Sequence, residues 1–195
     1  GVVVVNAGGS YLLAQALHAE IKQLTDLPVK FVTLENGQGH AMLGSDYWQQ
    51  QGAKVIAHDD TATEIEDHGY EALARMQGIQ RDKAMGTLLS QPDITFSNKY
   101  TLELGGEKIE LLNLGASHSH GDVVVWLPQR KFMIAGDIAF HQRLLPVFDD
   151  TDTAAWIQTW DAFTAIDADI IIPGHGDPTV LSELEKYTVD YLKYI

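Results

Sequence analysis

The chain of 195 residues contains no cysteine and few basic residues, with 13 Lys and Arg against 27 Asp and Glu. The lack of cysteine excludes disulfide bonds, thiolate metal ligands and cysteine nucleophiles together. A formal net charge of −14 repels phosphate backbones, so we expect no nucleic-acid partner. No apolar run reaches the length of a membrane-spanning helix, so we expect no membrane partner. The expected partner, a small-molecule substrate, rests on the metal-ligand motifs described below, and composition does not define an oligomeric state.

The N-terminus shows no signal peptide and begins directly on an apolar, β-branched run from Gly1 to Val5. Because this beginning is typical of the interior of a structural element, we expect further residues ahead of Gly1 that could include a targeting signal. A periplasmic or secreted location is favoured, since a chain without cysteine suits an oxidising compartment. Neither a linker nor a repeat divides the chain, so residues 1–195 are predicted to form a single domain.

The first half of the chain alternates strand-like and helix-like patterns, which is typical of a parallel sheet with helices packed on it. Apolar runs predict strands at 2–5, 30–34 and 54–57, with a short helix at 45–51. Ser10 is placed to cap the helix that follows the first strand. That helix is predicted to bury one apolar stripe, formed by Leu12, Leu13, Ala16, Leu17, Ile21 and Leu24. The polar stretch 60–90 predicts one or two helices that cover the site.

The second half carries shorter strand patterns separated by turn residues, which indicates hairpins. Strands are predicted at 94–96, 100–104, 108–114, 122–127, 131–135 and 170–172. Gly105–Gly106 and Pro128–Arg130 have the composition of hairpin turns. Helices are predicted at 153–166 and 179–193. The two halves together predict a mixed α/β (α+β) fold.

Three apolar runs in the second half lead to side chains that bind metals. The first presents His118 in a loop of small residues, the second ends on Asp137 and the third on His175. Taken singly, His118 could merely hydrogen-bond within its loop and Asp137 could merely cap backbone amides in a turn. Taken together they form the His and Asp ligand set that zinc and iron prefer, held on buried strands that fix the ligands in advance.

Three motifs carry a family resemblance: Gly-Ala-Ser-His-Ser-His-Gly-Asp at 115–122, Ala-Gly-Asp at 135–137 and Pro-Gly-His-Gly at 173–176. In this order they resemble the metallo-β-lactamase superfamily, and the run Arg143-Leu-Leu-Pro resembles its branch of quinoprotein-relay-type hydrolases. The resemblance extends over nearly the whole chain from Val2. It implies a four-layer αββα sandwich whose metal site lies along one edge of the two sheets. It also implies that the first strands of the N-terminal sheet are absent from this chain.

The family's main signature, His-x-His-x-Asp-His, departs strongly from its usual form here. At the corresponding place the chain has Glu35-Asn-Gly37-Gln-Gly39-His40, and only His40 matches. Glu35 and Gly37 stand where the resemblance implies two histidines, and Gly39 stands where it implies the aspartate. In the family, one metal uses those two histidines with the one at His118. The second metal uses the aspartate with the residues at His40, Asp137 and His175.

The resemblance and these departures together predict a reduced metal site. We expect one ion rather than two, with zinc favoured and iron possible, held by His40, Asp137 and His175. His118 is expected as a near neighbour or fourth ligand. The resemblance implies a metal-dependent hydrolase that attacks an ester, thioester or lactam carbonyl with metal-bound hydroxide. Asp137 and Glu35 are the expected catalytic carboxylates, with Glu35 in place of the aspartate that would orient the water.

Two alternatives stay open beside the hydrolase. The first is a non-catalytic, metal-poor relative that acts as a binding or accessory protein, because Glu35, Gly37 and Gly39 stand where ligands are expected. The second is a redox member of the same fold that uses iron, which the ligand set permits. The fold alone does not decide between them, since one fold hosts many chemistries.

The remaining polar and aromatic residues are predicted to be structural. His120 and His141 are expected at the surface of loops, although His141 could line the pocket. The other expected surface histidines are His18, His58 and His68. The large aromatic side chains are expected in the core: Tyr47, Trp48, Trp156 and Trp160. The acidic pairs Asp59–Asp60 and Asp149–Asp150 are expected in solvated turns or at helix N-termini.

Overall fold

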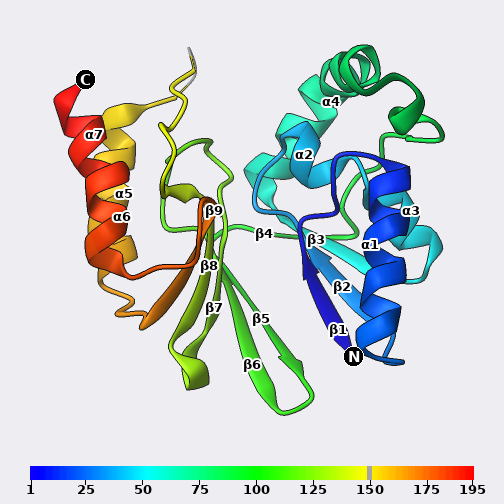
Figure 1. Cartoon of the computed structure of the whole chain (residues 1–195), viewed down its shortest axis with the longest axis horizontal. Coiled ribbons are helices and arrows are strands. Elements are labelled where there is room, and N and C mark those ends of the chain that lie inside the picture. Colours follow the sequence, from blue (N-terminus) through cyan, green and yellow to red (C-terminus); the bar gives the residue numbers. More distant parts are fainter. Residues whose placement is uncertain (149–150) are drawn as a thin grey trace. The chain divides into compact units, whose positions relative to one another are not determined.

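A computed structural model of the chain describes residues 1–148 and 151–195. The described chain divides into two compact units, Gly1–Phe96 and Ser97–Ile195. Each unit contains one β-sheet with its own helices (Figure 1). This division does not test the expectation of a single domain, which stays a prediction. The pair Asp149–Asp150 lies outside the described residues.

The N-terminal unit is built on a parallel sheet with the strand order β1-β2-β3-β4. Its strands are β1 (Val2–Val5), β2 (Val29–Thr33), β3 (Lys54–His58) and β4 (Ile94–Phe96). Its helices are α1 (Tyr11–Leu24), α2 (Gly39–Met42), α3 (Ser45–Gln50), α4 (Asp59–Gln80) and the 3₁₀ turn η1 (Arg81–Ala84). The predicted parallel sheet is confirmed by the pairing of its strands. Its β-branched strands are joined by helical crossovers, as parallel neighbours require.

The buried face of α1 is not the leucine stripe that the sequence predicts. Ala14 and His18 are the buried residues of this helix, whereas the leucines of the predicted stripe are 37–53% exposed in its first three turns and Leu24 is 86% exposed. The backbone of Gly44 approaches α1 so closely that an added Cβ would lie 2.9 Å from the Cβ of Ala14. A leucine does not fit this gap. The helix therefore turns its small residue toward the core and leaves the leucines outside.

The stretch predicted to hold one or two helices forms the 22-residue helix α4, followed by η1. The side chain of His58 caps its N-terminus by accepting a hydrogen bond from the backbone N–H of Asp60. Asp59 and Asp60 form the first turn, where carboxylates favour the positive end of the helix dipole. α4 packs against α2, the short helix that carries His40. The expected role of this stretch as a cover over the site stays a prediction.

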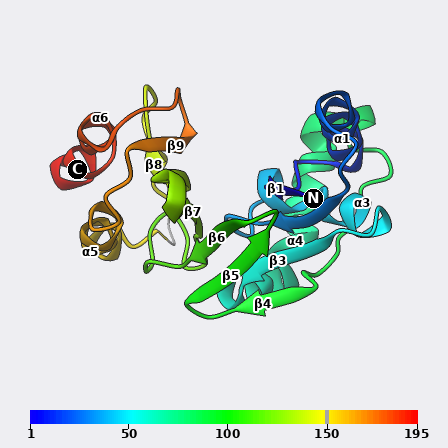
Figure 2. The same cartoon turned by 90° about the horizontal axis from the view of Figure 1, so that it is seen from below.

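The C-terminal unit contains a five-stranded sheet with the order β5-β6-β7-β8-β9, in which only β8 and β9 run parallel. The strands are β5 (Lys99–Leu104), β6 (Glu107–Leu112), β7 (Val124–Leu127), β8 (Phe132–Phe140) and β9 (Ile170–His175), with the 3₁₀ turn η2 (Pro128–Arg130). The helices are α5 (Thr153–Thr164), α6 (Leu181–Tyr187) and α7 (Val189–Tyr194), and Figure 2 shows α5 and α6 on the same side of β8 and β9.

The hairpin predictions in this unit are confirmed. Gly105 and Gly106 join β5 to β6, and both have positive φ angles, 63° and 84°. Two consecutive positive φ angles are what a tight hairpin turn of type I′ requires, and glycine adopts them without steric cost. Pro128–Arg130 forms η2 between β7 and β8.

The predicted C-terminal helix over 179–193 is in fact two helices. α6 ends before Thr188, whose φ and ψ angles are −111° and −81°, and α7 begins after it. The Thr188 hydroxyl accepts a hydrogen bond from the backbone N–H of Phe140 at 2.9 Å and donates one to the carbonyl of Phe140 at 3.2 Å. The Thr188 N–H still donates to the Leu184 carbonyl, and the Thr188 carbonyl still accepts from the Leu192 N–H, so the hydroxyl bonds tie the junction of the two helices to β8.

The predicted core aromatics are confirmed. Tyr47 and Trp48 are buried in the N-terminal unit, and Trp156 and Trp160 are buried in the C-terminal unit. The indole N–H of Trp48 donates to the Ala7 carbonyl, and that of Trp156 donates to the Ile138 carbonyl. None of the described helices combines the length and the hydropathy needed to cross a membrane.

Candidate metal site

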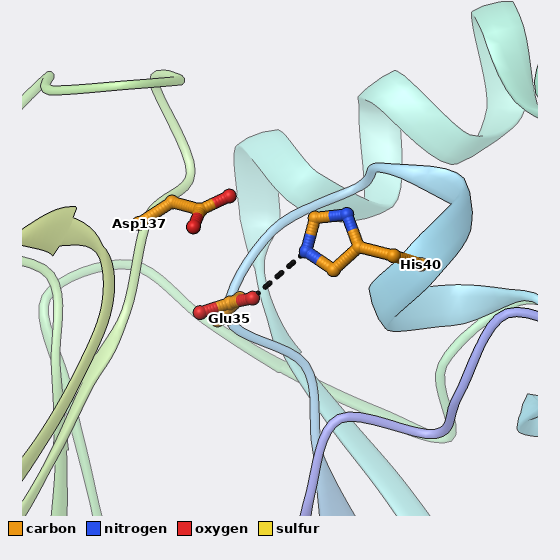
Figure 3. Close-up of side chains that lie close together, drawn as sticks. All are labelled: Glu35, His40 and Asp137. Atoms are coloured by element: carbon orange, nitrogen blue, oxygen red, sulfur yellow. Dashed lines mark hydrogen bonds and ion pairs between the residues drawn. The ribbon is translucent and has the colours of Figure 1, made fainter. Parts of the chain in front are cut away.

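In the N-terminal unit, Glu35 and His40 form a hydrogen-bonded pair at the carboxyl end of β2 (Figure 3). Glu35 Oε1 lies 2.9 Å from His40 Nε2 and also accepts a hydrogen bond from the Asn6 side-chain amide at 2.7 Å. The Asn6 amide oxygen accepts the backbone N–H of Glu35 at 3.0 Å. Asn6 thus holds both the backbone and the carboxylate of Glu35. When His40 is neutral, Nε2 carries the proton that Glu35 accepts, and the ligand lone pair lies on Nδ1.

Gly37 and Gly39, which stand where the resemblance implies metal ligands, are tightly packed inside this unit. A Cβ added to Gly37 would lie 2.7 Å from the carboxyl carbon of Glu64 on α4, and one added to Gly39 would lie 3.2 Å from Leu43 Cδ1. The side chain of Glu64 therefore occupies space that a larger residue at position 37 would need.

In the C-terminal unit, the Asp137 carboxylate faces two histidines, one with each oxygen. Oδ2 lies 3.8 Å from His118 Nε2, and Oδ1 lies 3.6 Å from His175 Nε2. These separations exceed hydrogen-bond length. Two donors that each lie about 2.1 Å from one tetrahedral zinc ion are about 3.4 Å apart. Each histidine–carboxylate pair therefore has a spacing compatible with two ligands of one ion, with a different carboxylate oxygen facing each histidine.

Asp137 lies inside β8, not at the end of a strand as predicted. β8 runs on to Phe140, and its register with β9 shifts between Ile134 and Gly136 and again between Gly136 and Phe140. Gly136 has a φ angle of 59°, which a residue with a side chain rarely adopts. An irregularity of this kind re-aims a side chain within a sheet. Asp137 is therefore presented by a distortion of β8, beside the last residue of β9.

Gly174 makes the close approach of β9 to Asp137 possible. A Cβ at Gly174 would lie 2.3 Å from Asp137 Oδ1 and 2.8 Å from the carbonyl carbon of Gly136. His175 follows as the last residue of β9, and the ring of Phe140 packs against its imidazole with the ring centroids 5.1 Å apart. The glycine before His175 is thus a packing requirement of the ligand cluster.

His118 lies in the loop between β6 and β7, and Asp122 organises that loop. The Asp122 carboxylate accepts hydrogen bonds from the Ser117 hydroxyl and from the backbone N–H and hydroxyl of Ser119. Burial raises the pKa of Asp122, while these hydrogen bonds and the charge of His118 act in the opposite direction. The two serines on either side of His118 are tied to one buried carboxyl group, so the loop backbone at His118 is restrained.

The other histidine predictions divide into correct and incorrect ones. His120 and His68 are exposed, as expected. His18, His58 and His141 are buried, so their surface assignments are wrong. His18 hydrogen-bonds the Tyr47 hydroxyl at 2.8 Å, His58 caps α4, and His141 hydrogen-bonds the Asp177 carbonyl through Nδ1 at 2.9 Å. Tertiary hydrogen bonds stabilise the buried imidazoles of His18 and His141, whereas His58 makes a local bond at the start of α4.

Two residues beside the candidate ligands were not singled out from the sequence for any role. Asn6 directly follows the first predicted strand, and its φ angle of 66° and its two bonds to Glu35 give it a defined structural role. Arg143 appeared only within a family motif, yet its guanidinium contacts His175. An Asn at the end of a buried strand and an Arg shortly after a candidate ligand were the available signals.

Comparison with known proteins places the chain in a family. The family model described as the metallo-beta-lactamase superfamily matches residues 40–175, which is more than half of the chain. The chain therefore belongs to the metallo-β-lactamase superfamily and has its metal-dependent hydrolase-like fold. The predicted family and fold class are confirmed. Metal identity, ion number and site residues are not tested by this match and stay predictions.

Individual relatives are distant. Metallo-beta-lactamase type 2 of Bacteroides fragilis is 28% identical over 117 residues, covering 58% of this chain and 46% of that protein. Linear primary-alkylsulfatase of a Pseudomonas species is 20% identical, covering 100% of this chain and 44% of that protein. The solved metallo-beta-lactamase from Pontibacter korlensis has a TM-score of 0.84 at 23% identity, covering 100% of this chain and 83% of that chain. The chain thus spans less than half the length of these two curated relatives.

Proposed function

We propose that this chain is a metal-dependent hydrolase with a reduced metal site, in which Asp137 is the central ligand. The arrangement of Asp137 carries the proposal, because each carboxylate oxygen faces the Nε2 atom of one histidine at 3.6–3.8 Å. A bound zinc or iron ion would supply a Lewis acid and would lower the pKa of a bound water to about 7. In the C-terminal unit His175 would join Asp137 as a ligand, with His118 as a near neighbour or fourth ligand.

His40 is proposed as the ligand from the N-terminal unit, with Glu35 as the residue that orients it. Ligating histidines usually donate their second ring N–H to a carboxylate, which sets the tautomer and the ring orientation. The 2.9 Å contact between Glu35 and His40 supports this role, since it would direct the Nδ1 lone pair of His40 toward a cation. Glu35 was predicted as a catalytic carboxylate, and its bonds to Asn6 and His40 favour a positioning role instead.

The substrate is proposed to be a small molecule with a polar bond to a carbonyl or to a similar electrophile. The names of the relatives differ: they include two type 2 metallo-beta-lactamases, an alkylsulfatase and a subunit of 2,4-dinitroanisole O-demethylase. Esters, thioesters and lactams are therefore tested beside an alkyl sulfate. Electrophiles of this kind gain most from a Lewis acid, because negative charge develops on an oxygen in the transition state.

A second candidate is a metal-poor relative that acts as a binding or accessory protein. Its support is in the N-terminal unit, where Glu35 already pairs with His40 and Glu64 fills the space beside Gly37. Under this proposal the triple variant with Glu35→His, Gly37→His and Gly39→Asp gains metal that the unmodified chain lacks, provided that the Glu64 side chain moves aside.

Elemental analysis of purified protein after incubation with zinc or iron and removal of unbound ion tests the proposal. We expect about one bound ion per chain, and we expect Asp137→Asn and His175→Ala to weaken binding at least about 100-fold, because each removes a direct ligand. His120→Ala is the matched control, since His120 is an exposed histidine of the same unit. Hydrolysis of a chromogenic ester, thioester, lactam or sulfate that persists after chelation would contradict the hydrolase proposal. Tight binding of two ions by the unmodified protein would contradict both candidates.

A further inference from the structure

A groove of about 540 Å³ lies between the first half of α1 and the end of α4 with η1, inside the N-terminal unit. Its lining consists of four apolar residues, two neutral polar residues and one cation: Leu12, Leu13, Ala16, Ile79, Ser10, Gln80 and Lys83. None of these is a proposed metal ligand. A volume of this size, a mainly apolar lining and few polar groups are usual for sites that bind small molecules.

The apolar side chains of the groove remain in contact with solvent. Leu13 is 53% exposed and Ile79 is 69% exposed. The close approach of Gly44 to Ala14 keeps α1 from turning its leucines into the core. Because burial of exposed apolar surface is favourable, an apolar ligand that covers these side chains gains affinity.

The walls of the groove are fixed by contacts of their own. The backbone N–H of Tyr11 donates to the Thr87 hydroxyl at 3.0 Å, which ties the start of α1 to the segment after η1. Leu13 packs over the backbone of Gly8, where an added Cβ would lie 3.6 Å from the leucine Cγ. A groove that is held open by such contacts loses little conformational freedom when a ligand binds.

Lys83 is the only charged residue among the described residues that line the groove. Over residues 1–148 and 151–195, Lys83 takes part in no salt bridge, whereas Lys54 of the same unit pairs with Asp93. A lysine can lay its alkyl stem along apolar surface while its ammonium stays in water. An unpaired cation beside an apolar lining complements a ligand that has an anionic head and an apolar tail.

We infer that this groove binds a free, single-chain carboxylate of medium length, with its tail along Leu12, Leu13 and Ile79 and its head at Lys83. An anionic membrane surface is the poorer partner, because a net charge of −14 repels it. The inference does not depend on a metal, since all lining residues lie in the N-terminal unit. Its failure would leave the proposed function standing.

Calorimetric titration of the full chain with octanoate, decanoate and dodecanoate, each below its micelle-forming concentration, tests the tail. We expect one carboxylate per chain and an affinity that rises about 5-fold for every two added methylenes, because the tail is buried in the groove. The head is tested with 1-decanol, which should bind about 3-fold more weakly than decanoate, as expected for the loss of one exposed ion pair.

Variants of the lining assign the binding to this groove. Ile79→Gln, alone and with Leu13→Gln, should weaken decanoate binding, and the double variant should do so at least about 10-fold. Leu24→Gln is the matched control, because Leu24 is an 86% exposed leucine of the same helix outside the groove. Urea unfolding shows whether each variant is folded, and Ile79→Gln alone, at an exposed position, keeps the test available if the double variant is not.

Lys83→Gln should bind decanoate as weakly as 1-decanol, and Lys83→Arg should restore the difference between the two ligands. Lys30→Gln, a change at an exposed lysine outside the groove, should leave both affinities unchanged. Decanoate affinities that are the same in the unmodified protein, Ile79→Gln and Lys83→Gln would overturn the inference, as would absence of binding. Sedimentation of the protein with phosphatidylglycerol vesicles, without binding of decanoate, would assign the groove to a membrane and overturn it. A dimer that Ile79→Gln dissociates would assign it to a second copy of the chain and also overturn it.

Discussion

The two units surround their buried carboxylates in different ways. In the N-terminal unit, one oxygen of Glu35 accepts from Asn6 at 2.7 Å and lies 2.9 Å from His40, and both distances are hydrogen bonds. In the C-terminal unit, the oxygens of Asp137 lie 3.8 and 3.6 Å from the Nε2 atoms of His118 and His175, beyond hydrogen-bond distance. A carboxylate and a histidine are therefore hydrogen-bonded to each other in the N-terminal unit. In the C-terminal unit the carboxylate lies beyond hydrogen-bond distance of both neighbouring histidines.

This difference follows from the backbone on which each carboxylate is carried. Glu35 lies in the loop after β2, where local turns allow Asn6 to reach both its backbone and its side chain. Asp137 lies within an irregular part of β8, and Gly174 of β9 packs directly on it. A carboxylate confined between two strands cannot relax toward either histidine as easily as one in a loop. The strand framework thus keeps the Asp137 carboxylate apart from both imidazoles, whereas the loop lets Glu35 bond His40 directly.

The largest effect is expected from adding one methyl group beside Asp137. Gly174→Ala places a Cβ 2.3 Å from Oδ1 and against the backbone of Gly136, so either β9 or Asp137 must shift. Overpacking of this kind costs about 3 kcal/mol of unfolding free energy, and the shift should also weaken zinc binding at least about 10-fold. Urea unfolding and chelator competition measure the two effects.

The matched control for this variant is Gly78→Ala. Gly78 lies within α4 and has no atom within 4 Å of an added Cβ. This substitution should raise the unfolding free energy by about 0.5–1 kcal/mol, because alanine favours helix more than glycine does. If Gly174→Ala behaves like Gly78→Ala, the close approach of β9 to Asp137 is not a constraint on the site.

A smaller loss of unfolding free energy is expected when the hydrogen bonds between Asn6 and Glu35 are removed. Asn6→Ala removes the amide that bonds Glu35 and leaves alanine at a φ angle of 66°, so about 2 kcal/mol of unfolding free energy should be lost. Asn6→Gly removes the same hydrogen bonds without the backbone strain and should lose less. The difference between the two variants in urea unfolding separates strain from hydrogen bonding. Equal stability of Asn6→Ala and the unmodified protein would show that Glu35 does not depend on Asn6.

The smallest effect is expected on the pH dependence of the unfolding free energy, through the buried His18 of the N-terminal unit. Burial, followed by the nearby charge of Lys22, lowers the pKa of His18 from its ordinary 6.5. Below pH 6.5 the unfolded chain therefore binds more protons at His18 than the folded chain does. The unfolding free energy that depends on neutral His18 is fully present above pH 6.5 and is lost progressively as the pH falls below it.

His18→Gln should therefore reduce the dependence of the unfolding free energy on pH between about 7.5 and 5.5. His68→Gln, a change at an exposed histidine, should leave that dependence as it is. Urea unfolding at several pH values measures both variants. An identical pH dependence in His18→Gln and the unmodified protein would remove His18 as a source of acid sensitivity.

The sequence by itself determined the strands, the hairpin turn at Gly105–Gly106 and the residue types of the candidate ligands. These follow from local rules: β-branched residues favour extended backbone, and paired glycines favour positive φ angles. The order of the motifs with His118, Asp137 and His175 was enough to suggest the family, and the family match over residues 40–175 confirms it. No packing information was needed for any of these predictions.

Only the tertiary structure decided which face of α1 is buried, where Asp137 lies in β8, and which partners Asn6 and Arg143 have. Each of these depends on the distance between segments far apart in sequence, such as Gly44 against Ala14 or the Arg143 loop against His175. Periodicity records the hydrophobicity of a residue but not the space available to it. Close packing decides such positions, because a gap too narrow for leucine admits alanine whatever the pattern predicts.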